Sequence, residues 1–233
     1  MRHICTYLLS LAVVAGASSQ SGSRIPELET IVTRMGEARA ENRAKLRPYE
    51  VTREYKLFGK DKHKPKSEIV ANLSFVPPNV KKFTIQSSSG AKGLGERIVR
   101  QMLEGEATAV EEYGSTDVSA ANYDFKFMHE EVVKGQRCYV LDLVPKRKEK
   151  NLLRGTIWVD ARTYMLHRFD GEPAKAPSWW LKEPHITFVY GDVSGMWLQT
   201  GSESRANVRI FGPYTMVSRD VRYQLSDPLT PNN

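Results

Sequence analysis

The side chains that most often carry out chemistry are few in this 233-residue chain, and they lie far apart. None of the five histidines stands at metal-ligand spacing from another. His129 is followed by two glutamates, but the second histidine of a zinc-protease motif is missing. We therefore expect neither a metal site nor a cofactor. The histidines are His3, His63, His129, His167 and His185.

The sequence likewise gives little support for a nucleophile or for a phosphate-binding loop. Cys138 lies in a predicted strand, where a cysteine is more often a small apolar residue than a nucleophile. The chain has no G-x-S-x-G motif, and the glycine cluster at 90–95 lacks the Lys-Ser or Lys-Thr pair of a phosphate-binding loop. The sequence nominates no catalytic residue, so we expect a protein that is not an enzyme. A hydrolase would need one polar residue whose replacement abolishes activity.

Two surface segments are candidates for contact with a partner or a membrane. Lys146, Arg147 and Lys148 open a basic run that could meet lipid head groups, although the tip of a hairpin is also where charge ordinarily lies. Trp179 and Trp180 are adjacent, and adjacent strand residues point to opposite faces, so one indole could be exposed. The alternative is that this pair covers an edge of the core.

The first 17 residues have the order of a cleaved secretion signal. Arg2 precedes an apolar run at 7–14, and small residues follow at 15–17. The run is far shorter than the roughly 20 residues of a membrane span, and a loose N-terminal anchor is the alternative. Cys5 would leave with the signal, so that Cys138 stays alone and no internal disulfide is expected. We expect an exported, periplasmic monomer that meets no nucleic acid, and we interpret the net charge of +7 first as solubility charge.

Hydrophobic periodicity predicts two helices. After a polar tether at 18–25, a helix with an apolar stripe opens at Pro26 and ends before Pro48. In the second helix, apolar residues recur at spacings of three and four over 94–103. Gly105 marks either the end of this second helix or a bend in it.

Most of the remaining chain alternates between polar and apolar residues with a period of two, which predicts strands. Three strands precede the second helix, and everything from residue 121 onward is strand and turn. Because helices never alternate with single strands, we expect no parallel βαβ units. We predict a sheet-dominated α+β fold, in which about ten antiparallel strands form a curved sheet covered by two helices. This single domain is expected over 26–226, with a tail at 227–233.

The order of elements resembles that of the periplasmic lipoprotein carriers of the LolA and LolB superfamily. The segment CYVLDLVPK at 138–146, followed by GTIWVD at 155–160, is similar to the Y-x-L-x-L-x-P-K and I-W-V-D patterns of outer-membrane lipoprotein-sorting proteins. The likeness covers essentially the whole chain after the signal. The sequence departs from the membrane-anchored relative because it has no lipobox cysteine, which favours a soluble carrier or sensor.

This resemblance implies an incomplete β-barrel closed by helices, with an apolar cavity that receives acyl chains of a lipid or lipoprotein. We therefore predict an exported carrier that makes at most transient contact with the membrane. The alternative is an envelope sensor or interaction module that binds an envelope protein on the same fold and transfers no lipid. From the alternation pattern, with the last two on the helical lid, the cavity would be lined by Tyr55, Leu73, Phe75, Phe83, Ile85, Phe125, Phe127, Leu141, Leu143, Met102 and Leu103.

Overall fold

The computed structural model describes residues 25–90, 93–175, 181–210 and 212–225. Within this part of the chain lie three helices and ten strands. The predicted signal at 1–17, nearly all of the tether and the tail at 227–233 lie outside it. The helices are α1 (Leu28–Lys45), α2 (Leu94–Glu111) and α3 (Tyr113–Thr116). The strands are β1 (Tyr49–Phe58), β2 (Ser67–Val76), β3 (Val80–Gly90), β4 (Tyr123–Val133), β5 (Gln136–Pro145), β6 (Leu153–Asp160), β7 (Leu166–Pro173), β8 (Leu181–Val193), β9 (Met196–Val208) and β10 (Gly212–Leu225).

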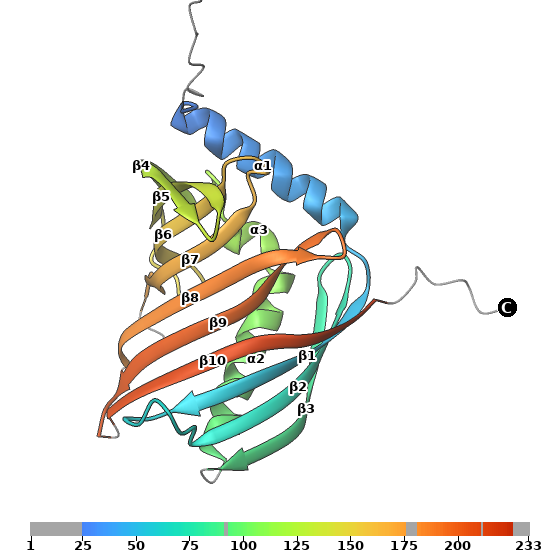
Figure 1. The fold of residues 1–233 in the computed structure, drawn as a ribbon, viewed down its shortest axis with the longest axis vertical. Helices are drawn as coiled ribbons and strands as arrows, with labels where there is room; N and C mark the ends of the chain where they lie inside the picture. Colours follow the sequence, from blue (N-terminus) through green and yellow to red (C-terminus); the bar gives the residue numbers. More distant parts are fainter. Residues whose placement is uncertain (1–24, 91–92, 176–180, 211, 226–233) are drawn as a thin grey trace, which may run out of the picture.

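All ten strands form one antiparallel sheet in the order β3-β2-β1-β10-β9-β8-β7-β6-β5-β4. The chain closes on itself through the pairing of β1 with β10, while β3 and β4 stand at the two ends and do not pair with each other in the described residues. The barrel is therefore incomplete. In Figure 1, α2 runs along one side of the sheet and α1 crosses one end of it. The predicted sheet-dominated α+β fold is confirmed, with the short α3 added to the two expected helices.

The strands form where the sequence alternates, and the inward side chains make the core. In β1, Val51, Tyr55 and Leu57 are buried while Glu54 and Lys56 are exposed. The middle of β9 escapes this signal because it is polar, although both ends of the strand contain apolar residues. Its Ser202 faces inward and shares a hydrogen bond of 2.7 Å with Ser218 of β10, so that two buried hydroxyls satisfy each other. A hydrogen-bonded serine pair therefore replaces an apolar contact in this part of the sheet.

Bulges and a pair of glycines accompany the bending of the sheet. The pairing of β1 with β10 shifts register between Thr52 and Arg53, and four further strand pairs contain a similar shift. Bulges of this kind bend a strand and increase its twist. Gly155 of β6 lies opposite Gly171 of β7, and a Cβ on Gly171 would come within 2.1 Å of the carbonyl oxygen of Arg154. Backbones this close leave room for glycine alone.

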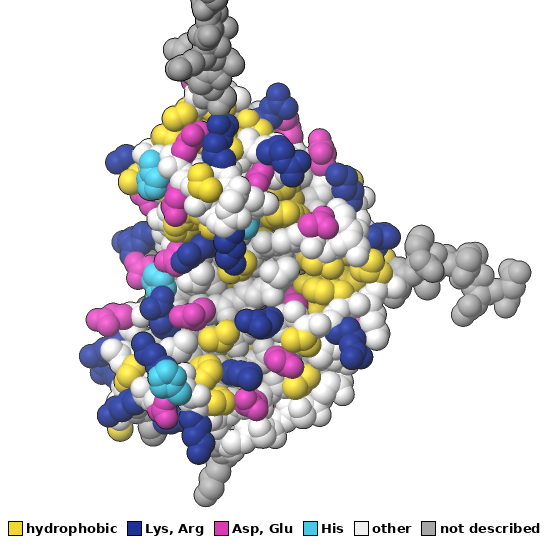
Figure 2. Space-filling model, viewed as in Figure 1, with side chains coloured by type: hydrophobic (Ala, Val, Ile, Leu, Met, Phe, Trp, Pro, Cys, Tyr) yellow, Lys and Arg dark blue, Asp and Glu magenta, His cyan; other side chains and the backbone are white. Residues whose placement is uncertain are grey.

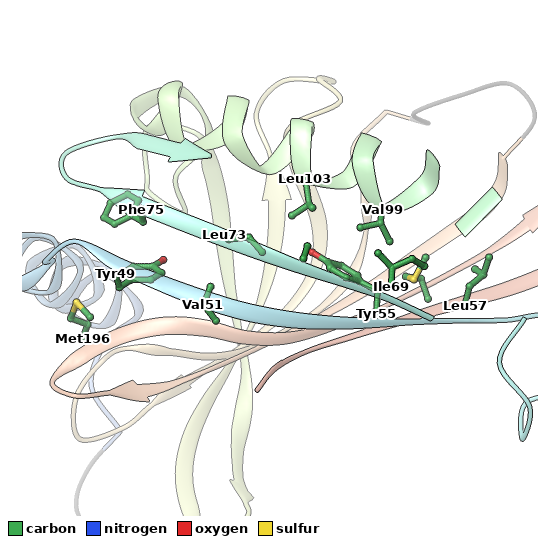
Figure 3. Packing of buried hydrophobic residues seen from close by; sticks show 12 residues of the cluster. Tyr49, Val51, Tyr55, Leu57, Ile69, Leu73, Phe75, Val99, Leu103 and Met196 are labelled. Atoms are coloured by element: carbon green, nitrogen blue, oxygen red, sulfur yellow. The ribbon is translucent and has the colours of Figure 1, made fainter. Parts of the chain in front are cut away.

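The buried side chains divide into two clusters. The first cluster lies between α2 and the strands β1, β2, β9 and β10, and Figure 3 shows Val99 and Leu103 of α2 pointing toward Leu73 and Ile69 of β2. The second lies between α1 and the strands β4 to β7. The fully buried members of the first cluster include Tyr55, Leu57, Ile69, Ala71, Leu73, Val99, Leu103 and Met196. Those of the second include Ile31, Tyr123, Tyr139, Leu141, Leu143, Leu152, Ile157, Val159 and Phe169.

Candidate functional site

A cavity of about 390 Å³ lies where the two core clusters meet. It is bounded by α1, by the C-terminal half of α2 and by the strands β1, β2, β3, β7, β8 and β9. Its volume is near the lower end of the roughly 300–1,000 Å³ of known ligand sites. The apolar part of the wall includes Met35, Leu46, Phe75, Val110, Leu166 and Leu198. The polar part includes Arg39, Asn42, Lys81, Glu106, Asp117 and Tyr190.

The apolar wall is drawn from both clusters. Phe75 belongs to the first cluster and Met35 to the second. Leu198 packs against the first cluster and Leu166 against the second, and both line the cavity. Each cluster is filled around its own helix, and the two do not merge. The cavity is therefore the part of the concave interior that neither helix fills.

A buried network of four charges holds α2 to the sheet beside this cavity. Arg53 of β1 donates from Nη2 to Asp220 Oδ2 at 3.2 Å and from Nη1 to Glu106 Oε2 at 2.9 Å. Lys81 of β3 pairs with the other oxygen of Glu106. The side chains of Arg53 and Asp220 are 5 % and 1 % exposed, so solvent screens this pairing little. Two cations and two carboxylates make the network neutral overall.

The network fixes the ionisation of Glu106. Burial by itself would raise the pKa of this carboxyl group, but the charges of Lys81 and Arg53, together with their hydrogen bonds, lower the pKa to about 2. The pKa values of two tyrosines that line the same cavity shift in the opposite direction. Burial, and after it the negative charge of Glu106, raises the pKa of both Tyr49 and Tyr190. At neutral pH the site thus contains an ionised carboxylate and two protonated phenols.

Polar contacts fasten α1 across the other side of the cavity. The side-chain amide of Asn42 accepts from the backbone N–H of Trp197 at 2.7 Å and donates to its carbonyl oxygen at 3.0 Å. Arg39 pairs with Asp117 at 3.1 Å and also donates to the carbonyl oxygen of Val118. Both anchors lie among the residues that line the cavity. The position of α1 therefore depends on hydrogen bonds to backbone groups as well as on its apolar stripe.

The predicted cavity-lining residues fall into both clusters, and Phe75 alone among them borders the cavity itself. Met102 and Leu103 lie on α2 and pack in or against the first cluster. Those of the first cluster or packed on it are Tyr55, Leu73, Phe75, Phe83, Ile85, Met102 and Leu103. Those of the second cluster or packed on it are Phe125, Phe127, Leu141 and Leu143.

The basic segment that was predicted as a partner or membrane surface is partly engaged within the fold. Lys146 donates to the carbonyl oxygen of Ala120 at 2.6 Å. Arg147 donates at 3.0 Å both to the carbonyl oxygen of Ser115 and to the side chain of Asn122. These contacts tie the connection between β5 and β6 to α3 and to the segment that follows it, whereas Lys148 is exposed. Trp179 and Trp180 lie outside the described residues.

The polar residues of the site were missed from the sequence, although Arg53 and Glu106 left a signal there. Arg53 occupies an inward position of β1 between Val51 and Tyr55, and Glu106 continues the apolar stripe of α2 three residues after Leu103. A charge at an inward position of an amphipathic element indicates a buried partner of opposite charge. Tyr190 gave no such signal, because a tyrosine in a strand is ordinary.

Cys138 and the described histidines do not line this cavity. Among the described residues no three His, Cys, Asp or Glu side chains gather as they would around a metal ion. Cys138 is fully buried in β5, and burial raises the pKa of its thiol to about 11, with smaller contributions from Asp160 and Glu131. A thiol with so high a pKa is a poor nucleophile at neutral pH.

The surface carries charges of both signs. On the face shown in Figure 2, lysines and arginines are interspersed with aspartates and glutamates, and hydrophobic side chains gather toward the right of the view. The excess positive charge is therefore spread over this face and forms no single basic patch on it. No helix within the described ranges is long and apolar enough to cross a membrane.

Comparison with known proteins gives matches among solved structures alone. No model of a known protein family matches the chain, and no curated protein does. A structure described as an outer membrane lipoprotein-sorting protein domain from Vibrio parahaemolyticus is 14 % identical, with a TM-score of 0.44 over 84 % of this chain and 93 % of that one. A DUF1329 family protein from Desulfovibrio piger is 14 % identical, with a TM-score of 0.42 over 87 % and 94 %. A LolA superfamily protein from Nitrosomonas europaea is 11 % identical, with a TM-score of 0.39 over 87 % and 95 %.

The superfamily that the sequence resembles is thus also found among the solved structures that match this chain. With identities of 14 % or less and TM-scores below 0.5, this likeness assigns no ligand and no activity. Function has to be argued from the residues of this chain.

Proposed function

We propose that this chain is an exported, periplasmic binding protein that holds an acyl chain of a lipid or lipoprotein in the cavity between α1, α2 and the sheet. One observation carries the proposal, namely a cavity of about 390 Å³ that opens where two apolar clusters fail to merge. An apolar wall with a few convergent polar groups is typical of a site for a hydrophobic ligand. The resemblance of the 138–160 segment to lipoprotein-sorting proteins supports the ligand class.

Such a protein needs binding and release, and no reaction. Burial of an acyl chain gains about 0.8 kcal/mol per methylene, so eight buried methylenes contribute about 6 kcal/mol. That corresponds to a dissociation constant in the range of tens of micromolar. Affinity of this order suits a carrier, because a receiving membrane or protein can then compete for the chain.

The proposal is tested by filling the cavity. Ala109 lines it from α2, and Ala109→Trp would place an indole in the space. The matched control is Thr108→Trp, on the exposed face of the same helix. The delipidated chain is titrated with the neutral fluorescent probe N-phenyl-1-naphthylamine, and native mass spectrometry records lipid that co-purifies from envelope extract.

We expect the unaltered chain and the control to bind the probe equally and to carry lipid, and Ala109→Trp to bind about tenfold more weakly or worse. Circular dichroism checks that both variants are folded. If the unaltered chain neither carries lipid nor binds the probe, or if the filled variant binds as well as the control, the chain does not use this cavity for lipid.

A second candidate is the envelope sensor or interaction module. Strand β4 stands at one end of the open sheet, and its Met128 and Val132 are 50 % and 68 % exposed. An edge strand with exposed apolar side chains can accept a strand from a partner. A stoichiometric protein captured from envelope extract that binds Ala109→Trp normally but is lost with Val132→Lys would favour the module over the carrier.

A further inference from the structure

Tyr49 of β1 and Tyr190 of β8 line the cavity, and the hydroxyl of neither makes a hydrogen bond within the described residues. Tyr49 is 8 % exposed, and its ring is fixed between the rings of Phe75 at 5.3 Å and Tyr223 at 6.0 Å. Buried tyrosine hydroxyls normally find a partner. These two are therefore available as donors to a ligand that enters the cavity.

The charges beside these hydroxyls are already balanced. Glu106 lines the same cavity, and both of its oxygens accept from Arg53 and Lys81. Arg53 is in turn shared with Asp220, so the network has no cation left for a further anion. Because its pKa is lowered to about 2, Glu106 stays ionised throughout the usual pH range. A second carboxylate placed next to it would find no free cation in this network, and its burial would cost more than that of an uncharged ester.

The remaining cations of the lining come from α1 and are engaged as well. Arg39 pairs with Asp117 and donates to the carbonyl oxygen of Val118. Arg43 donates to the carbonyl oxygen of Pro78 at 3.4 Å. A carboxylate that bound either arginine would compete with groups of the protein itself.

We infer that the cavity selects an acyl chain ending in an uncharged hydrogen-bond acceptor, above all an ester carbonyl, over a free fatty acid. The tyrosine hydroxyls would donate to the carbonyl oxygen, while the apolar wall holds the chain. The inference rests on the proposed function, and it narrows the ligand from acyl chains in general to acyl esters such as those of glycerides and lipid-modified proteins.

The experiment compares two ligands that differ in this one group. Methyl dodecanoate and dodecanoate are each titrated against N-phenyl-1-naphthylamine bound to the full chain at pH 8. Both ligands are kept below the concentrations at which they aggregate. We expect the ester to bind about tenfold more tightly or better. The titration is repeated at pH 3.5, where dodecanoic acid is largely protonated, given about 4.3 for an unperturbed carboxyl group, and Glu106 is still ionised. There the difference between ester and acid should nearly vanish.

A conservative variant tests the role of the hydroxyl. Tyr190→Phe keeps the ring and removes the donor, and we expect the affinity for the ester to fall about two- to tenfold with little change for dodecanoate. The control is Tyr214→Phe, whose hydroxyl lies near Lys66 outside the cavity and whose loss should leave both affinities unchanged.

Different outcomes would overturn the selection of esters and the binding of acyl chains. If dodecanoate binds at pH 8 as tightly as its ester, or if Tyr190→Phe weakens both ligands equally, the selection of esters is overturned while acyl binding stands. If neither ligand displaces the probe and Ala109→Trp changes nothing, the acyl-binding proposal itself fails.

Discussion

The two halves of the molecule are covered by helices of equal length that are held in different ways. Among the described side chains, α1 buries two large apolar residues, Ile31 and Met35, and α2 likewise buries two, Val99 and Leu103. Apolar contact therefore does not distinguish them. The difference lies in the polar contacts that anchor each helix.

The anchor of α2 is a buried ion network, and that of α1 is a set of hydrogen bonds nearer to solvent. Glu106, whose side chain is 26 % exposed, fixes α2 through Arg53, which is 5 % exposed and also pairs with the buried Asp220. Asn42 and Arg39 fix α1, and the Arg39 side chain is 31 % exposed. A buried charge without its partner is far more costly than a lost hydrogen bond at a partly exposed site. We therefore expect α2 to be the more rigid cover of the cavity and α1 to open at lower cost.

The largest loss of stability is expected when Arg53, the central cation of the network, is replaced. Arg53→Met leaves the buried Asp220 without its cation and Glu106 with Lys81 alone, and we expect a loss of about 3–5 kcal/mol in the free energy of unfolding. Urea denaturation followed by circular dichroism measures it. The control is the exposed Arg219→Met on β10, expected to change stability by about 0.5 kcal/mol or less. A loss below about 1 kcal/mol for Arg53→Met would show that the network does not anchor α2.

A shortened side chain in the second cluster should lower stability without changing the affinity for the ligand. Leu141 is fully buried in the second cluster and does not line the cavity. We expect Leu141→Ala to lower the free energy of unfolding by about 3–4 kcal/mol while probe affinity in the folded fraction stays unchanged. Leu73→Ala is the matched variant in the first cluster and should behave alike. Weaker binding by Leu141→Ala alone would mean that the ligand occupies the second cluster.

The ion network should also give the stability a defined pH dependence. The pKa of Glu106 is lowered from 4.5 to about 2 in the folded chain, so the folded state binds this proton less readily than the unfolded state. The associated stability is present above about pH 4.5 and is lost as the pH falls toward 2, amounting to about 2–3 kcal/mol. Glu106→Gln removes this contribution. The difference in unfolding free energy between the two chains should therefore shrink on acidification, and a constant difference from pH 7 to 3 would contradict the assignment.

The fold could be predicted from the sequence to the extent that it follows periodicity. Alternation in β1 and the stripe of α2 were enough to predict an open antiparallel sheet with helical covers, because both patterns report burial directly. The choice at Gly105 between an end and a bend could not be made, and α2 continues through it to Glu111. A single exposed glycine costs a helix about 1 kcal/mol, which the buried contacts on either side of it outweigh.

The site was less predictable, for a physical reason. Inward-facing residues such as Leu141 look identical in the sequence whether they fill a core or line a cavity, because alternation reports which face a residue lies on and says nothing of how the opposite side is filled. The cavity depends on the distance between two clusters whose members come from both ends of the chain. Charged residues at inward positions, Arg53 and Glu106, were the better local markers of the site.

The smallest effect should come from loosening α1, and it sharpens the comparison of the two covers. Asn42→Ala removes both hydrogen bonds to the backbone of Trp197, and we expect a loss of about 1–2 kcal/mol. Asn42→Asp keeps the acceptor for the Trp197 N–H and should lose about half as much. Amide hydrogen exchange is the more telling measurement, because exchange in α1 and at Trp197 should accelerate while α2, held by Glu106, keeps its protection. Equal acceleration in both helices would mean that the covers open together, and the distinction between a rigid and an opening side would then be wrong.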